Sequence, residues 1–211
     1  MITLSPRFAE NSINKYWVNS SEWTGNDENY SMNIFMTIKK ILNADKKQKI
    51  LDYGCGKADI AEKFKKEGFD ITCCDISDKY VLSAQEQGLD SYSCKEIIER
   101  GKKFDKIYMN NGFFYVHPKK YIKFLSGING ILNENGELYL LTVATFDKRS
   151  YYHKGISKII TRFFPVYQVH IGGFFVKDKI LKKSAIKAGF KFIDRIKEEE
   201  SDARTNFILR K

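Results

Sequence analysis

The sequence predicts an α/β fold, namely a doubly wound, mostly parallel seven-stranded sheet with an antiparallel last strand and helices on both faces. Three observations lead to this prediction. From residue 49 onward, short apolar runs alternate with segments whose apolar residues recur at helical spacing. Helices of this length between strands imply right-handed crossovers and a parallel sheet that is buried on both faces. Only a short acidic loop separates the last two apolar runs, which favours antiparallel pairing of those runs.

The first four expected strands are short runs rich in apolar or β-branched residues, at 49–53, 69–75, 89–94 and 104–110. The expected helices lie around and between them, at 32–42, 58–67, from a cap at Ser77 or Asp78 to Gly88, and at 96–100. Pro118 opens a further helix, because proline is favoured at the first helical position. The remaining elements are a turn at 133–136, a strand at 137–144, a helix at 179–188, and strands at 191–196 and 205–210.

Length and composition limit the class of protein. A chain of 211 residues suits one globular domain, and 43% hydrophobic with 29% charged residues excludes a disordered or collagen-like chain. No apolar stretch approaches the ~20 residues of a membrane-spanning helix, and we expect a cytoplasmic protein because no secretory signal is visible. We expect no metal site, because the cysteines fall in no metal-ligand spacing (Cys55, Cys73, Cys74 and Cys94).

The net charge of +10 is unevenly distributed along the chain. Residues 51–100 carry a net charge of −4, whereas residues 151–211 carry +8. A basic surface attracts nucleic acid, phosphorylated substrates or an anionic surface, although a lysine-rich composition alone also produces such an excess.

One segment carries the chemistry of a ligand site. Residues 50–58 leave a strand and enter a helix, with Gly54 and Gly56 in the turn between them. Glycines allow a tight turn and close approach of a ligand, and the helix N-terminus is electropositive. Asp75 lies 21 residues after Gly54, at the end of the next expected strand, where a carboxylate can accept both hydroxyls of a ribose. The combination indicates a nucleoside-bearing ligand.

Asp52 indicates which nucleoside. A carboxylate two residues before the first glycine would repel a pyrophosphate, whereas it suits a ligand with an amine and a sulfonium. The spacing also departs from a dinucleotide fingerprint, because Asp59 stands where that fingerprint has glycine or alanine.

The run Asp52-x-Gly54-x-Gly56, with Asp75 and the closing antiparallel pair of strands, resembles class I S-adenosylmethionine-dependent methyltransferases, nearest to their small-molecule, ubiquinone-biosynthesis-like branch. The resemblance covers roughly residues 45–210, and Ala58 replaces the third glycine usual in the family. It implies a methyltransferase domain at 45–211 that binds S-adenosyl-L-methionine, preceded by an N-terminal cap and helix region at 1–44. A substrate lid is expected at 147–176, which is aromatic, basic and without a clean period.

The resemblance also implies roles for single residues. Asp52, Gly54, Cys55 and Gly56 would face the methionyl end of the cofactor. Asp75 would hold the ribose, and Ile76 would pack beside the adenine. The remaining cofactor contacts are Cys94 and Lys95 near the adenine edge, and Asn110 near the methionine group and the methyl acceptor.

On the acceptor side, His117 and His153 are the candidate catalytic bases, since a histidine has a pKa suited to deprotonating a hydroxyl. The candidate substrate-binding residues are aromatic or polar and lie near the cleft mouth or in the expected lid: Tyr115, Tyr151, Tyr152, Tyr167 and His170. The segment after Asn110 lacks the Asn-Pro-Pro-aromatic motif of adenine-amino methyltransferases, and no Pro-Cys pair is present. Both absences disfavour those nucleobase chemistries.

The primary hypothesis is therefore methyl transfer to an oxygen or nitrogen of a small metabolite or saccharide-type acceptor, by a monomer or homodimer. A tRNA or rRNA methyltransferase stays open because of the basic last third, although that part holds no separate RNA-binding module. A non-catalytic, cofactor-binding regulatory protein also stays open, because the motif residues bind and do not react. A nicotinamide oxidoreductase is disfavoured by Asp52.

Overall fold

The computed structural model describes residues 28–144, 178–196 and 204–211 of the chain. Within these residues, seven strands form one sheet in the order β3-β2-β1-β4-β5-β7-β6. Strands β1 to β5 pair in parallel, and β7 runs antiparallel to both β5 and β6, so the predicted fold class is confirmed. The strands are β1 Lys49–Tyr53, β2 Asp70–Asp75, β3 Asp90–Ser93, β4 Phe104–Asn110, β5 Leu132–Ala144, β6 Phe192–Ile196 and β7 Arg204–Arg210.

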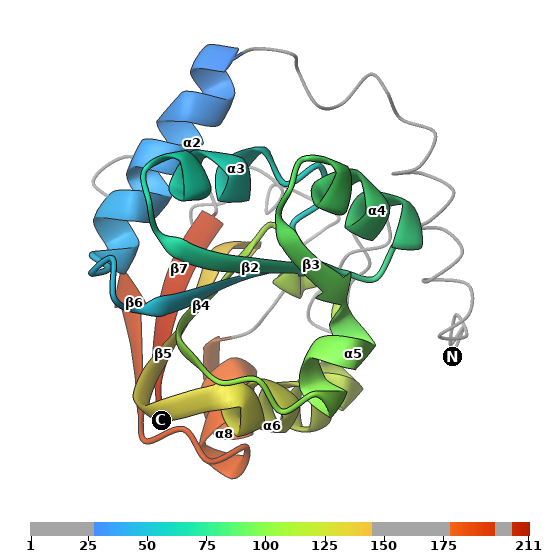
Figure 1. Ribbon diagram of the computed structural model, residues 1–211. Helices are drawn as coiled ribbons and strands as arrows, with labels where there is room; N and C mark the ends of the chain where they lie inside the picture. The colour runs from blue at the N-terminus through green and yellow to red at the C-terminus, as the bar shows by residue number, and fades with distance from the viewer. Residues whose placement is uncertain (1–27, 145–177, 197–203) are drawn as a thin grey trace, which may run out of the picture.

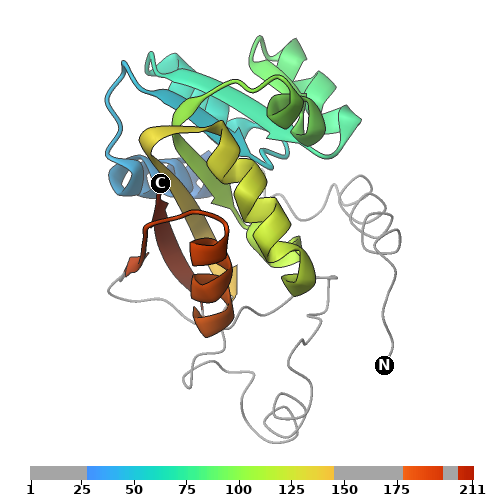
Figure 2. The same cartoon turned by 90° about the horizontal axis from the view of Figure 1, so that it is seen from below.

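The helices cover the sheet on both sides. Figure 1 shows α2, α3 and α4 above the sheet and α5, α6 and α8 below it. Seen from below in Figure 2, α6 and α8 lie side by side across the lower face. The helices are α2 Glu28–Leu42, α3 Asp59–Lys66, α4 Asp78–Glu86, α5 Cys94–Glu99, α6 Tyr121–Ile131 and α8 Asp178–Lys187, with short 3-10 turns η1 Phe113–Tyr115 and η2 Pro118–Lys120.

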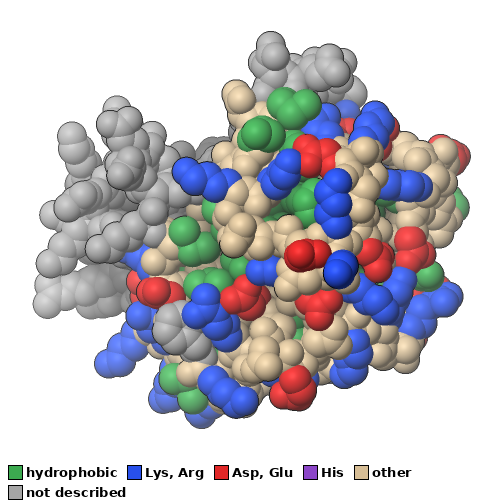
Figure 3. Space-filling view, turned by 60° about the vertical axis from the view of Figure 1, so that its left-hand side comes forward, with side chains coloured by type: hydrophobic (Ala, Val, Ile, Leu, Met, Phe, Trp, Pro, Cys, Tyr) green, Lys and Arg blue, Asp and Glu red, His purple; other side chains and the backbone are tan. Residues whose placement is uncertain are grey.

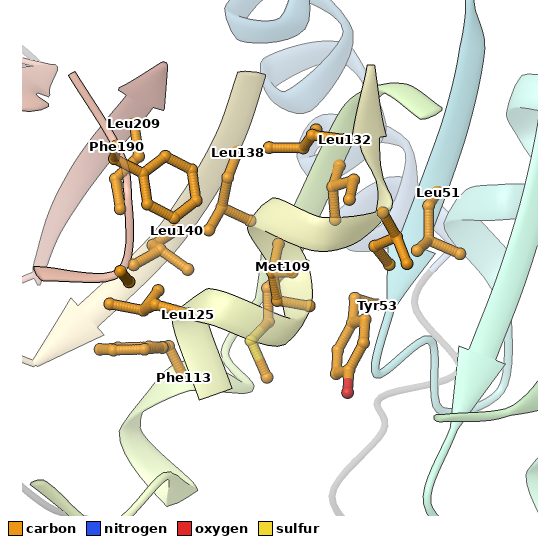
Figure 4. Close-up of a cluster of buried hydrophobic side chains, with 14 of the residues drawn as sticks. Leu51, Tyr53, Met109, Phe113, Leu125, Leu132, Leu138, Leu140, Phe190 and Leu209 are labelled. Atoms are coloured by element: carbon orange, nitrogen blue, oxygen red, sulfur yellow. The ribbon is translucent and has the colours of Figure 1, made fainter. Parts of the chain in front are cut away.

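Each face of the sheet is packed with apolar side chains. Successive residues of a strand point to opposite faces, so Ile50 and Leu51 of β1 are both fully buried but belong to different clusters. Ile50 packs in the upper cluster, under α2, α3 and α4, and Leu51 in the lower cluster, against α5, α6 and α8. Figure 4 draws the lower cluster, where the hydroxyl of Tyr53 points away from the leucines.

Several boundaries differ from the sequence predictions. Strand β5 begins at Leu132, not after a turn at 133–136. The expected turn is instead an irregularity within the strand, because Leu132 pairs with Phe104 while Glu137 pairs with Lys106. The three additional residues of β5 are accommodated by a left-handed conformation at Asn135 (φ 62°).

Two helices also begin earlier than expected. Helix α5 begins at Cys94 because Ser93 and Glu96 form a capping box, in which each side chain accepts from the other residue's backbone N–H. Helix α2 begins at Glu28, and its Phe35, Ile38 and Leu42 are buried in the upper cluster. The division of the chain at residue 45 stays a prediction, and the expected lid at 147–176 lies outside the described residues.

The strand order creates the place for a site. It reverses between β1 and β4, which lie side by side at the centre of the sheet although β2 and β3 intervene in sequence. In open α/β sheets, ligands bind beyond the carboxyl ends of the strands at such a switch point. The carboxyl ends concerned are Tyr53 of β1, Asp75 of β2 and Asn110 of β4.

Candidate active site at the carboxyl ends of β1, β2 and β4

The turn after β1 has an unusual backbone. Gly54 and Gly56 have φ angles of +83° and +55°, in the left-handed region that glycine adopts without strain. Among the described residues, no atom lies within 4 Å of a Cβ placed on either glycine, so this part of the chain leaves one side of the turn open. Ala58, the residue before α3, also has a left-handed backbone (φ 61°), a conformation that glycine adopts with less strain than alanine.

Strand β2 holds this turn in place through its backbone. The carbonyl oxygen of Cys74 accepts hydrogen bonds from the N–H groups of Gly54 (2.8 Å) and Cys55 (3.0 Å). These two bonds hold the first residues of the turn against the end of β2.

Asp75, the next residue of β2, joins the turn to the start of α4. Its Oδ2 accepts a hydrogen bond from the N–H of Gly56 (2.9 Å), and its Oδ1 accepts one from the N–H of Ser77 (2.9 Å). Burial raises the pKa of Asp75 from its ordinary value, although these hydrogen bonds oppose the shift. A carboxylate oxygen accepts more than one hydrogen bond, so each oxygen of Asp75 retains capacity for a ligand hydroxyl.

Asp52 is a buried carboxylate beneath the turn. It is only 3% exposed, and its Oδ2 accepts a hydrogen bond of 2.7 Å from the hydroxyl of Tyr108 on β4. Burial raises the pKa of Asp52 to about 7; the hydrogen bond from Tyr108 lowers it, and the charge of Asp75 raises it further. Such a carboxylate favours a cation close by, because a positive charge offsets the loss of hydration.

Comparison with protein families identifies the class. A family model described as a methyltransferase domain matches residues 28–193, which is most of the chain. The chain belongs to the class I S-adenosylmethionine-dependent methyltransferases. A comparison with curated proteins gives no match.

Solved structures of other methyltransferases share the fold of this methyltransferase. The 1,6-didemethyltoxoflavin-N1-methyltransferase of Burkholderia thailandensis, solved with 1,6-didemethyltoxoflavin and S-adenosylhomocysteine, is 18% identical (TM-score 0.66, covering 100% of this chain and 92% of that one). A methyltransferase from Archaeoglobus fulgidus is 14% identical (TM-score 0.62, 86% and 94% covered). One from Bacteroides fragilis, in complex with S-adenosylhomocysteine, is 20% identical (TM-score 0.60, 81% and 75% covered).

The residues of the methyltransferase fit S-adenosylmethionine. The open side of the Gly54–Gly56 turn admits a ligand against the backbone, and Asp75 offers acceptors at the sheet edge. Asp52 is a buried carboxyl group beneath the same turn, and a cation bound nearby would favour its ionised form. Ile76, directly after Asp75, exposes 51% of its surface, which is high for an isoleucine and leaves an apolar side chain free for a flat ring.

The expected adenine-edge residues lie on α5. The side chain of Cys94 is buried in the lower cluster, with its Sγ 3.6 Å from the Sγ of Cys74. Lys95 extends into solvent and forms an ion pair with Glu99 (3.6 Å). Cys55, in the turn itself, is half-buried. Their contacts with a cofactor stay predictions.

On the acceptor side, the structure describes the segment after β4 only in part. Asn110 is half-buried at the end of β4, and Tyr115 is half-buried in η1. The structure therefore brings Asn110 to the same sheet edge as Asp52 and Asp75. The other predicted acceptor-side residues lie outside the described residues: Tyr151, Tyr152, His153, Tyr167 and His170.

His117 caps the turn η2. Its Nδ1 accepts a hydrogen bond of 3.1 Å from the backbone N–H of Lys119. Burial, with Lys119 and Lys120 nearby, lowers the pKa of His117, so the ring is neutral at neutral pH and carries its proton on Nε2. Service as a base at Nδ1 would require this atom to give up its hydrogen bond from Lys119. The catalytic role of His117 stays a prediction.

Two contributors were absent from the sequence analysis. Tyr108 reaches Asp52, and the carbonyl of Cys74 holds the turn. Alternation within β4 places Tyr108 on one face, but its alignment with Asp52 depends on the strand register, which the sequence does not show. Over the described ranges, no cluster of three or more metal-ligating side chains is present, and no helix is long and apolar enough to cross a membrane.

Proposed function

We propose that this methyltransferase transfers a methyl group from S-adenosyl-L-methionine to an oxygen or nitrogen of a small-molecule acceptor, such as a metabolite or a saccharide. The observation that carries the proposal is the connection of Asp75 to the Gly56 N–H at the switch point of the sheet. It supports the proposal because a carboxylate beside a backbone turn at the carboxyl ends of the strands can accept the hydroxyls of a ribose.

In this proposal, the cofactor supplies a methyl group already activated by its sulfonium. Asp75 accepts the ribose hydroxyls, Ile76 packs against the adenine, and Asp52 offsets the positive charge of the methionyl end. Asn110 lies where the methionyl group and the acceptor meet. The protein then chiefly orients the acceptor's lone pair, which accounts for much of the rate in reactions of this kind.

One observation supports a small acceptor. The Burkholderia thailandensis relative was solved with 1,6-didemethyltoxoflavin, a small molecule, and its fold covers the whole of this chain. Figure 3 shows the face around α2 and the β6 edge, where lysine and arginine side chains are interspersed with aspartate and glutamate side chains. This face lies away from the carboxyl ends of β1, β2 and β4, so its charges do not bear on the acceptor.

The test uses methyl-labelled S-adenosylmethionine. The purified protein is incubated with a cell extract divided into a small-molecule fraction and an RNA fraction, and the labelled product is identified by mass analysis. We expect label in the small-molecule fraction, lost with Asp75→Ala and retained with Asp78→Ala, a change at an exposed acid in the first turn of α4. Label in RNA would overturn the acceptor class. Cofactor binding without transfer to either fraction would favour the regulatory alternative.

A further inference from the structure

Asp52, beneath the open turn, is hydrogen-bonded to a residue outside the turn, Tyr108 of β4. The two residues are partners in the parallel register of β1 and β4, so their side chains leave the same face of the sheet. Both are almost completely buried, at 3% and 0% exposure. The hydroxyl of Tyr108 donates to Oδ2 of Asp52, and no described residue donates a hydrogen bond to Oδ1.

We propose that Tyr108 is a positioning residue: its hydroxyl holds the Asp52 carboxylate in the orientation and charge state that receive the cationic methionyl end of S-adenosylmethionine. This inference rests on the proposed function. Tyr108 acts through Asp52 and needs no contact with the cofactor itself.

The surroundings of Asp52 show why such a residue is needed. The titratable groups that face it are Asp75 and Cys73 of β2, Cys55 of the turn and Tyr108 of β4. None of these four groups is a cation, and burial and Asp75 both disfavour the ionised carboxylate. The hydrogen bond from Tyr108 is the influence that favours ionisation, because a donor stabilises the charged form.

The upper cluster contains a matched control. Tyr139 of β5 is the register partner of Tyr108 and is also buried, at 3% exposure. Its hydroxyl donates to a carboxylate too, Oε2 of Glu137, at 2.5 Å. Tyr139→Phe therefore removes the same group from the same cluster, but from a pair on the neighbouring strand that does not include Asp52.

The first measurement needs no cofactor. The carboxyl carbon of Asp52 is followed by NMR in the free protein as the pH is raised. We expect a midpoint near neutral pH in the wild type, a higher midpoint in Tyr108→Phe and an unchanged one in Tyr139→Phe. A wild-type midpoint at the ordinary aspartate value would overturn the proposal even where Tyr108→Phe does not fold.

The second measurement is the affinity for S-adenosylmethionine by calorimetry, from about pH 5.5 to about pH 8.5. Below the midpoint of Asp52, affinity should rise about tenfold per pH unit and then level off, because binding requires the ionised carboxylate. Tyr108→Phe should move the levelling point to higher pH and lower the affinity at neutral pH. Tyr139→Phe should keep the wild-type profile, and Asp52→Asn should lose this dependence. Ionisation of the cofactor itself is common to all variants, so the differences between variants report Asp52.

The outcomes separate this inference from the proposed function. Failure of the wild type to bind S-adenosylmethionine at any pH would reject the proposed function. Binding by the wild type, with Tyr108→Phe weakened equally at all pH values or not at all, would reject the positioning role alone.

Discussion

Asp75 and Gly56 are joined by a hydrogen bond of 2.9 Å from the glycine N–H to Oδ2 of the carboxylate. The bond links the end of β2 to the turn after β1, two segments 19 residues apart in the sequence. One side chain therefore fixes the shape of the turn and presents acceptors to a ligand beside it.

The first prediction concerns this carboxylate. Asp75→Ala removes acceptors for two ribose hydroxyls, and hydrogen bonds to a charged group contribute about 1.5–3 kcal/mol each. We expect the affinity for S-adenosylmethionine to fall by at least about 100-fold, measured by calorimetry. Asp78→Ala should leave the affinity unchanged. An Asp75→Ala protein that is folded and binds as the wild type does would refute the assignment of the ribose site.

The second prediction concerns the open side of the turn. Gly56→Val places a branched side chain in the space beside the backbone, so we expect cofactor binding to be abolished. Gly101→Val is the control, because Gly101 has a similar φ of +62° and no described atom lies within 4 Å of its Cβ position. Both substitutions should cost about 1–2 kcal/mol of stability or more from the left-handed backbone. Only Gly56→Val should lose binding, and equal loss in the two variants would point to general unfolding instead.

The third prediction concerns the stability of the free protein and its pH dependence. The pKa of Asp52 is about 7 in the fold and 3.8 ordinarily, so between these values the folded state keeps a proton that the unfolded chain has released. The free energy of unfolding therefore decreases as the pH rises from about 4 to about 7.

Asp52→Asn removes this dependence and keeps an acceptor for Tyr108. It should stabilise the free protein by about 2–4 kcal/mol above neutral pH, with the gain vanishing below about pH 4. Urea unfolding at several pH values measures the difference, with the exposed Asp78→Asn as the control. A variant less stable than the wild type at pH 8 would contradict the prediction.

The fourth prediction concerns Ala58, which holds a left-handed backbone at the start of α3. Ala58→Gly relieves about 1–2 kcal/mol of backbone strain but adds chain entropy on unfolding and removes a buried methyl group. The net change in the free energy of unfolding should lie within about 1 kcal/mol of zero. Ala61→Gly, within the helix and equally buried, should destabilise the fold by about 1.5–2 kcal/mol, because glycine has a low helix propensity and the substitution removes a buried methyl group. Comparable losses in the two variants would show that Ala58 is not strained.

Much of the fold follows from local patterns. Alternating apolar runs and helical segments predicted the doubly wound, mostly parallel sheet. The glycines at 68 and 88, which follow α3 and α4, have the left-handed backbones typical of helix ends. The irregularity in β5 was not predictable, because residues 133–136 read locally as a turn. Their incorporation into a strand depends on the pairing of Leu132 with Phe104, two residues far apart in the sequence.

The site was predictable where one segment carries it. Gly54, Gly56 and Asp75 stand at the ends of consecutive strands, and parallel strands bring those ends together. The contact of Tyr108 with Asp52 was not predicted from the sequence. It depends on which residue of β1 lies opposite Tyr108, and hydrophobic periodicity within β4 does not fix that alignment. The identity of the acceptor was not predictable for a different reason. Aromatic and histidine side chains suit many small molecules, so these residue types do not indicate which molecule binds.

Tyr108 and Tyr139, which are register partners, each donate a hydrogen bond to an acid, Asp52 and Glu137 respectively. The effects of these two acids on stability depend on pH in opposite ways. Burial alone would raise the pKa of Glu137, but hydrogen bonds from Lys106, Tyr139 and Arg210 lower it to about 2, so acid below about pH 4.5 weakens the fold. A rise in pH from about 4 to about 7 weakens it through Asp52 instead. The empty enzyme should thus tolerate heat best in mildly acidic solution and worst at the pH where its cofactor binds most tightly. Binding of the cofactor should then raise the melting temperature most at about pH 7 and above, where the free protein is weakened through Asp52.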